Sequence, residues 1–325
     1  MFFTWIVLSA FVLCGGCRRT ADDVSQNAQN NAEQRESNKD AAAIVSPENE
    51  PQRIISTVPS VTEVLFALGL GNRVVGVSRF CRYPKEVEKL PDVGGLFDPN
   101  DEALLELRPD LVILLSENVE REERIKSFGV SCLKVDHRSI EGIIDSFARI
   151  GNRCGAESAK YAVEWRRNIR ERLDAIVQRT AALPKRSALI TLYDESDTTM
   201  QSAIIAASNP FFHRAIELAG GVNAAKNIKV AFPTVSGEGI LELNPDIVIG
   251  IASREPVASQ SAALWEREKV SKSEAFVRDW ERFAPFSPAV KNHRVVLIRE
   301  DYAVIPGPRF ILFVEQLAEI LHPSK

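Results

Sequence analysis

The chain has 325 residues, of which 45% are hydrophobic and 26% are charged, a composition typical of a globular protein with one very large domain or two modest ones. The formal net charge of -4 gives no general attraction to polyanions, so the charge argues against nucleic-acid binding.

The N-terminal segment predicts export. Residues 1–13 are almost wholly apolar and are followed by Cys14-Gly15-Gly16-Cys17. Such a run is shorter than the roughly 20 residues that span a bilayer, but it matches the apolar region of a signal peptide. The small residues before Cys17 are typical of a lipobox. We expect a signal peptide over 1–17, lipidation of Cys17 and a periplasmic or extracytoplasmic location at the membrane; the alternatives are a simple cleaved signal and an uncleaved anchor.

Residues 18–52 form a segment of different composition, rich in Asn, Gln, Glu, Asp, Ala and Ser. Such a segment cannot bury enough apolar surface to offset the entropy of ordering it, so we expect a disordered tether. A flexible coil of this length has an end-to-end distance of roughly 30–35 Å.

Two series of short apolar runs and amphipathic stretches follow, a pattern that favours α/β units with parallel sheets. The first predicted lobe, 53–153, has strands at 53–56, 74–77, 111–115 and 131–135 and helices at 60–68, 101–107, 121–128 and 139–151. The second, 184–325, has strands at 187–192, 247–251 and 295–298 and helices at 211–219, 236–243, 273–279 and 309–321.

Between the two lobes, residues 156–182 contain neither Gly nor Pro, and their apolar residues recur at roughly helical spacing. A helix of that length is about 40 Å long. We therefore predict a connecting helix within 154–183. An ordinary surface helix is the alternative.

The two lobes share an internal repeat. The sequence Leu-Glu-Leu-Arg-Pro-Asp-Leu-Val-Ile at 105–113 reappears as Leu-Glu-Leu-Asn-Pro-Asp-Ile-Val-Ile at 241–249, an offset of 136 residues. The unit predicts a helix halted by proline, a turn and a buried strand. Many α/β folds use this pattern, but its presence once in each half suggests two similar lobes.

An ordered series of motifs resembles the metal-chelate class of periplasmic substrate-binding proteins, whose members bind cobalamin, ferric siderophores or haem for ABC importers. The matching segments are 53–69, Val74–Val77, Tyr83-Pro84, Pro91–Gly95, Gly220-Gly221 and both copies of the repeat, and the resemblance covers nearly all of 53–323. It implies two similar Rossmann-like lobes with central parallel sheets, joined by a single long α-helix, with the ligand in the cleft between them.

The resemblance also implies that one glutamate on each lobe docks onto the permease of the importer. The matching positions are Glu63 and Glu238. Each has a local alternative, because Glu63 completes a capping box with Ser60 and Glu238 is an acidic residue in the first turn of a helix.

The resemblance places a set of ligand-binding residues in the cleft: Phe80, Tyr83, Leu96, Phe97, Phe232, Asp301, Tyr302 and Arg309. Aromatic faces suit a flat macrocycle or a catechol, and Arg and Asp orient polar groups. Arg79 and Arg82 would add to a site for an anionic ligand. Core packing for the aromatic residues and a solvated surface for the arginines are the alternatives.

The chain shows little sign of enzyme chemistry or of a resident cofactor. It has no P-loop and no G-x-S-x-G elbow, and its four histidines are widely spread, which argues against a site for bare zinc or manganese. Of the three cysteines beyond the export signal, Cys132 and Cys154 could pair and leave Cys81 free.

These observations predict a substrate-binding lipoprotein of an ABC importer that is not an enzyme. A corrinoid is slightly favoured over a ferric siderophore. The alternatives are a haem receptor, in which Tyr83 or Tyr302 would serve as axial ligand, and a chelate-modifying enzyme on a related two-lobed fold.

Overall fold

The computed structural model describes residues 45–95, 98–195, 200–252 and 262–323. The predicted signal peptide, Cys17, the tether up to residue 44, Leu96 and Phe97 lie outside the described residues. None of the described helices is both long and apolar enough to span a bilayer.

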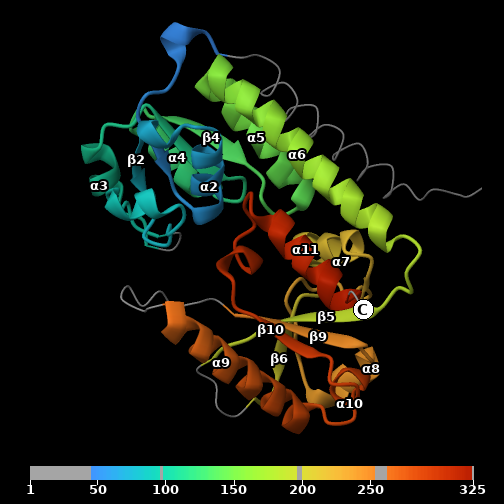
Figure 1. Cartoon of the computed structure of the whole chain (residues 1–325). Coiled ribbons are helices and arrows are strands. Elements are labelled where there is room, and N and C mark those ends of the chain that lie inside the picture. The colour runs from blue at the N-terminus through green and yellow to red at the C-terminus, as the bar shows by residue number, and fades with distance from the viewer. Residues whose placement is uncertain (1–44, 96–97, 196–199, 253–261, 324–325) are drawn as a thin grey trace, which may run out of the picture. The chain divides into compact units, whose positions relative to one another are not determined.

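The first lobe is built on a four-stranded parallel sheet in the order β2-β1-β3-β4 (Figure 1). The strands are β1 (Ile54–Ser56), β2 (Val74–Val77), β3 (Leu111–Leu115) and β4 (Ser131–Val135), and the helices are α2 (Pro59–Ala67), α3 (Asp101–Glu106), α4 (Val119–Ser127) and α5 (Ile140–Cys154). Strand β3 is almost wholly buried, as its unbroken apolar sequence predicts for a central parallel strand.

The second lobe has a six-stranded sheet in the order β10-β9-β5-β6-β8, with β7 also paired to β5. The strands are β5 (Ser187–Leu192), β6 (Ala203–Ile205), β7 (Val222–Asn223), β8 (Thr234–Val235), β9 (Ile247–Ile251) and β10 (Val295–Ile298). The helices are α7 (Pro210–Leu218), α8 (Gly237–Leu243), α9 (Ala262–Phe283), α10 (Pro288–Lys291) and α11 (Phe310–Leu321).

The central strands β10, β9 and β5 of the second sheet run parallel, as expected, and the sheet adds short antiparallel strands that the sequence did not predict. Strand β6 runs antiparallel to β5 and to β8. The link between β5 and β6 is residues 193–202, and a parallel crossover needs about a dozen residues or more, usually in a helix. The short link therefore makes the chain turn back antiparallel to β5.

Helix α6 (Ala156–Thr180) follows α5 directly and leads to β5, so it connects the two lobes as predicted (Figure 1). One hydrophobic cluster includes buried residues of both lobes and of α6, among them Phe147, Ile169, Ile176 and Phe313. The lobes therefore share packed apolar surface in addition to the covalent link.

The internal repeat has the same helix cap in both lobes. Helix α3 begins after Asn100, whose side chain accepts a hydrogen bond from the Ala103 N–H, and α8 begins after Ser236, whose side chain accepts one from the Gly239 N–H. Both pairs are separated by the offset of 136 residues found in the sequence. The repeat thus extends several residues before its visible sequence match.

The turn of the repeat is also equivalent in the two lobes. Arg108 and Asn244 both adopt a positive φ, of 43° and 49°. Asp110 accepts hydrogen bonds from backbone N–H groups just before β1, and Asp246 accepts one from the N–H of the first residue of β5. The shared aspartate therefore ties the repeat to the neighbouring strand in each lobe.

Two expectations need correction. Residues 45–52, assigned to the tether, are attached to the first lobe, since Glu50 pairs with Arg73 at 3.0 Å and the Val45 N–H bonds to the Asn152 carbonyl. The tether was predicted from its low content of apolar residues, but this segment is held to the lobe by polar contacts, which composition does not predict. Cys132 and Cys154 are not paired, and the thiols of the described cysteines are free.

Candidate functional site

A cluster of charged and aromatic side chains lies where the two lobes meet. The Arg309 guanidinium donates hydrogen bonds to both carboxylate oxygens of Glu63, at 3.1 and 2.6 Å, and to both of Asp301, at 2.7 and 3.0 Å. Its Cζ atom lies 4.0 Å from the centroid of the Tyr83 ring, a cation–π contact. Glu63 and Tyr83 belong to the first lobe, and Asp301 and Arg309 belong to the second.

The parallel strands place these residues at the carboxyl ends of the sheets. Glu63 lies in α2, which follows β1, and Tyr83 lies in the segment after β2. Asp301 follows β10, and Arg309 is the N-cap residue of α11. Ligands of open α/β sheets bind at this edge, so the cluster lies where a ligand is expected.

Burial and charge oppose each other in this cluster. Burial raises the pKa of Glu63 above its usual value, although the nearby Arg309 acts in the opposite direction. Burial lowers the pKa of Arg309, but its hydrogen bonds to Glu63 and Asp301 outweigh that effect and raise it overall. The guanidinium is therefore charged, and two carboxylates share one positive group.

Three of the predicted aromatic residues are exposed. Phe80 is 58% exposed, Tyr83 47% and Phe232 41%, so their ring faces are accessible to a ligand. Phe232 packs edge-on against Phe212 at 6.2 Å, and Phe212 in turn packs against Phe313 at 6.0 Å. The structure therefore brings Tyr83 together with Arg309, and it links Phe232 through Phe212 to α11, the helix that begins after Arg309.

Two other predicted residues have partners within their own lobe. The Tyr302 hydroxyl lies 3.2 Å from Gln316 Oε1, and its ring packs against the hydrophobic cluster. Arg79 pairs with Asp98 at 2.9 Å. Neither side chain belongs to the Arg309 cluster, and Arg82 is exposed.

The two predicted docking glutamates have different environments. Glu238 is exposed in the first turn of α8. Glu63 is buried and paired with Arg309, so it is not the structural counterpart of Glu238. The offset of 136 residues identifies that counterpart as Glu102, which is exposed in the first turn of α3. Sequence reasoning missed Glu102 because the repeat was not extended back to the start of the helix.

Two buried polar groups had no sequence signal. His137, after β4, shares a hydrogen bond of 2.8 Å with the Ser60 hydroxyl. In the second lobe, the buried Arg299 side chain pairs with Glu195 at 2.5 Å and with Glu268 at 3.0 Å, which fastens α9 to the end of β10. Both contacts join segments far apart in sequence, so no local sequence pattern predicts them.

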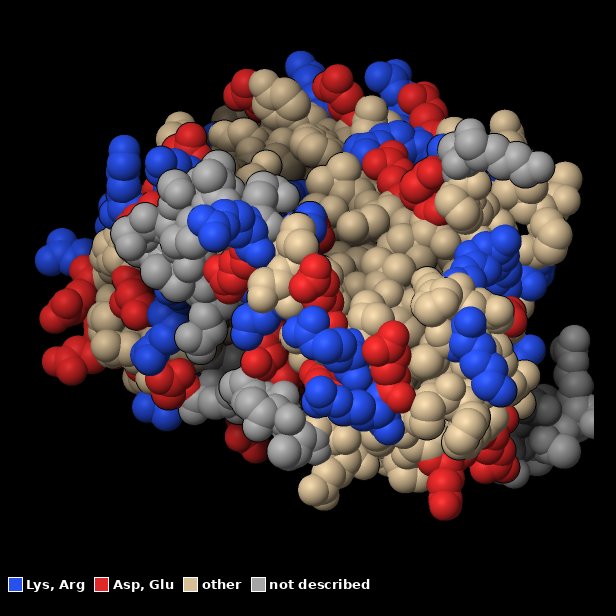
Figure 2. Space-filling view, turned by 60° about the horizontal axis from the view of Figure 1, so that its bottom comes forward, with Lys and Arg blue, Asp and Glu red and all other residues tan. Residues whose placement is uncertain are grey.

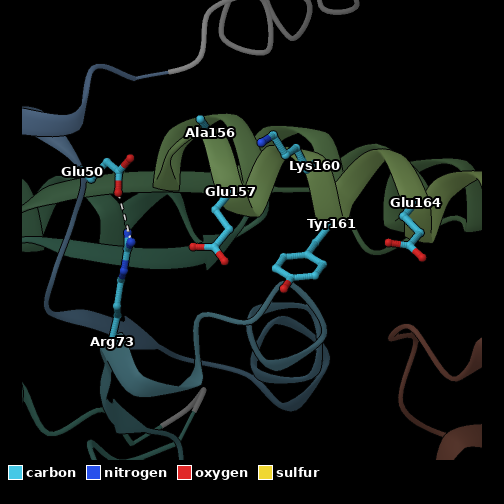
Figure 3. A pocket seen from close by; sticks show the side chains of 7 residues that line it. All are labelled: Glu50, Arg73, Ala156, Glu157, Lys160, Tyr161 and Glu164. Carbon is cyan, nitrogen blue, oxygen red and sulfur yellow. Dashed lines mark hydrogen bonds and ion pairs between the residues drawn. The ribbon is translucent and has the colours of Figure 1, made fainter.

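A separate surface hollow of about 590 Å³ lies beside the start of α6 (Figure 3). Its lining is mostly charged and consists of Glu50, Arg73, Ala156, Glu157, Lys160, Tyr161 and Glu164. None of these is a predicted cleft residue. On the face shown in Figure 2, basic and acidic side chains are interspersed, in line with the argument against a polyanionic partner.

Metal ligands are not grouped in the described part of the chain, where no three His, Cys, Asp or Glu side chains are placed to hold an ion. The polar groups of the Arg309 cluster are suited to hydrogen bonding with an organic ligand. Aromatic faces beside such groups suit a large, partly apolar molecule.

Comparisons with known proteins identify the family of the chain. A family model described as periplasmic binding protein matches residues 54–302. The uncharacterized ABC transporter substrate-binding lipoprotein YvrC of Bacillus subtilis is 29% identical, over 98% of this chain and 96% of that protein. The vitamin B12-binding protein of Pectobacterium atrosepticum is 28% identical, over 85% of this chain and 90% of that protein.

A solved structure has the same fold. The crystal structure of the periplasmic vitamin B12 binding protein BtuF of Vibrio cholerae superposes with a TM-score of 0.66 at 23% identity, over 83% of this chain and 96% of that one. Since the family model covers well over half of the sequence, this chain belongs to the periplasmic binding protein family.

Proposed function

We propose that this chain is the substrate-binding lipoprotein of an ABC importer, exported and anchored through Cys17. It captures one metal chelate between its lobes, with a corrinoid favoured over a ferric siderophore, and it delivers the chelate to the permease without changing it chemically. The observation that carries the proposal is the charged Arg309 cluster between the lobes, with the half-exposed Tyr83 ring against the guanidinium, in a chain similar to vitamin B12-binding proteins.

A ligand panel tests the capture step. Cobalamin, haem, ferric citrate and a ferric hydroxamate are each added to the purified chain, and the midpoint of thermal unfolding is measured. A ligand at 100 times its dissociation constant stabilises the folded state by about 2.7 kcal/mol. We expect the largest shift with cobalamin. A shift with none of the four would contradict chelate capture.

Haem is the second candidate ligand because Tyr83 is a half-exposed phenol, and a tyrosine can ligate haem iron. Haem binding through this residue would produce a Soret absorption band that is lost in the Tyr83→Phe variant. An unchanged Soret band in that variant would exclude Tyr83 as the ligand.

For delivery, we propose that Glu102 and Glu238 contact the permease, in place of the expected pair Glu63 and Glu238. The support is their equivalent position in the repeat and their exposure. Exposed charges mainly affect association and register, so the contact should weaken with salt.

The docking pair has a matched control on the same two helices. Glu106 and Glu242 are also exposed and are also separated by 136 residues. The double variant Glu102→Lys, Glu238→Lys should abolish uptake by the importer and leave the ligand affinity unchanged. The double variant Glu106→Lys, Glu242→Lys makes the same change in charge and should retain uptake. Equal uptake by the two variants would refute the assignment.

A further inference from the structure

Arg309 has carboxylate partners on both lobes. Its Nη2 group donates to Glu63 of the first lobe at 2.6 Å and to Asp301 of its own lobe at 3.0 Å. The two carboxylates therefore compete for one guanidinium. Loss of the Glu63 contact would still leave Arg309 paired with Asp301.

The lobes approach each other closely at this point. A methyl group on Gly307 would lie 3.0 Å from Glu63 Oε2 and 3.3 Å from the Ser60 Cα atom. A methyl group at position 307 would force Glu63 or the backbone of α2 to move by a few tenths of an ångström, so glycine suits this close approach. The ion pair and the small residue together describe a close-fitting contact.

A second ion pair between the lobes provides a contrast. Arg214 of α7 pairs with Glu141 of α5 at 3.1 Å, with side chains 43% and 65% exposed. The Glu63 side chain is only 2% exposed. Water and salt weaken the exposed pair, whereas the buried pair keeps most of its interaction. The contact at Arg309 is therefore the less screened of the two ion pairs, although burial also raises the pKa of Glu63.

We propose that Glu63 and Arg309 form a latch that holds the lobes together in the ligand-free chain, and that Asp301 is the alternate partner that retains Arg309 when the latch opens. Opening returns Glu63 to water and frees the face of Tyr83 that Arg309 covers, while Asp301 keeps the guanidinium paired. The latch is thus a reversible gate beside the cleft. The inference does not depend on which ligand is bound or on the transporter.

Isosteric substitutions test the latch in opposite directions. Glu63→Gln removes the charge on the first lobe, and Asp301→Asn removes the competing charge. Glu141→Gln, at the exposed inter-lobe pair, is the matched control. Solution X-ray scattering of the ligand-free full chain measures the radius of gyration, and hydrogen exchange measures the protection of the amides in 79–84.

We expect Glu63→Gln to increase the radius of gyration and the exchange in 79–84, and Asp301→Asn to leave the radius unchanged or reduce it and to slow that exchange. Glu141→Gln should match the unmodified chain. The latch would be refuted if Glu63→Gln behaved as Glu141→Gln does, or if both cluster variants loosened the lobes. Should Glu63→Gln not fold, Gly307→Ala, which wedges the same contact by a methyl group, must produce the loosening instead.

Discussion

At the scale of single residues, His137 makes the stability of the fold dependent on pH. Burial lowers its pKa from 6.5 to about 4, against the smaller opposite effect of Asp136. A histidine in the unfolded chain has a pKa near 6.5, so between these two values the unfolded chain binds more protons than the folded one. The free energy of unfolding therefore falls as the pH falls through this window.

We expect His137 to account for a loss of as much as about 3 kcal/mol between pH 7 and pH 4. The variant His137→Gln keeps a side chain that can bond to Ser60 but does not titrate, so its stability should depend less on pH. Urea unfolding over this range checks the prediction. The same pH dependence in both proteins would show that His137 is not the titrating group.

The repeat offers a second prediction at this scale. Arg108 and Asn244 both have positive φ, a region that costs an ordinary residue about 1–2 kcal/mol but suits Asn and Gly better. Arg108→Gly should therefore raise the free energy of unfolding by roughly 0.5–1 kcal/mol, since part of the gain is lost to the flexibility of glycine. Asn244→Gly should change it little. A less stable Arg108→Gly variant, measured by urea unfolding, would contradict this account.

The residues of the site were predictable only in part. The family resemblance grouped Tyr83, Asp301 and Arg309, which the structure places together. It also assigned Glu63 to permease docking, with a capping box at Ser60 as the alternative, whereas α2 begins after Val58 and has no side-chain cap. The pairing of Glu63 with Arg309, 246 positions away, depends on how the lobes meet and has no local signal.

At the scale of elements, α6 is an integral part of the core that joins the lobes. Ile169 is fully buried on α6, and Val163, on the same helix, is 69% exposed. Ile169→Ala should lower the free energy of unfolding by about 2–5 kcal/mol, while Val163→Ala should change it by no more than about 0.5 kcal/mol. Chemical denaturation followed by circular dichroism distinguishes the two. Similar losses would mean that α6 packs as an ordinary surface helix.

Strands of four to six residues were predicted best. The predicted bounds of β2, β3, β4, β5, β9 and β10 are confirmed residue for residue. Strands β6, β7 and β8 were missed because each has only two or three residues, too few to establish a period. Helix α9 spans Ala262–Phe283, whereas only 273–279 was predicted. The prediction was too short because the N-terminal half of the helix is rich in charged residues and has no clear apolar stripe.

At the scale of the whole molecule, the shared hydrophobic cluster limits how far the lobes move. Separation at the cleft must be small, because a wide opening would break apolar contacts among α5, α6, α7 and α11. A small opening at the Glu63–Arg309 contact is compatible with this packing. The chain is therefore suited to capture a ligand by a modest change in the cleft, without a large hinge motion.

Calorimetric titration of cobalamin into the purified chain tests the central claim most directly. The claim predicts one intact cobalamin bound per chain, and an affinity at least about tenfold lower in the double variant Phe80→Ala, Phe232→Ala, because two exposed aromatic faces are removed. Phe286→Ala, which removes a phenylalanine that is 69% exposed beside α10, should bind as the unmodified chain does. Absence of binding, equal affinities in all three proteins, or a chemically altered cobalamin would contradict capture in the cleft.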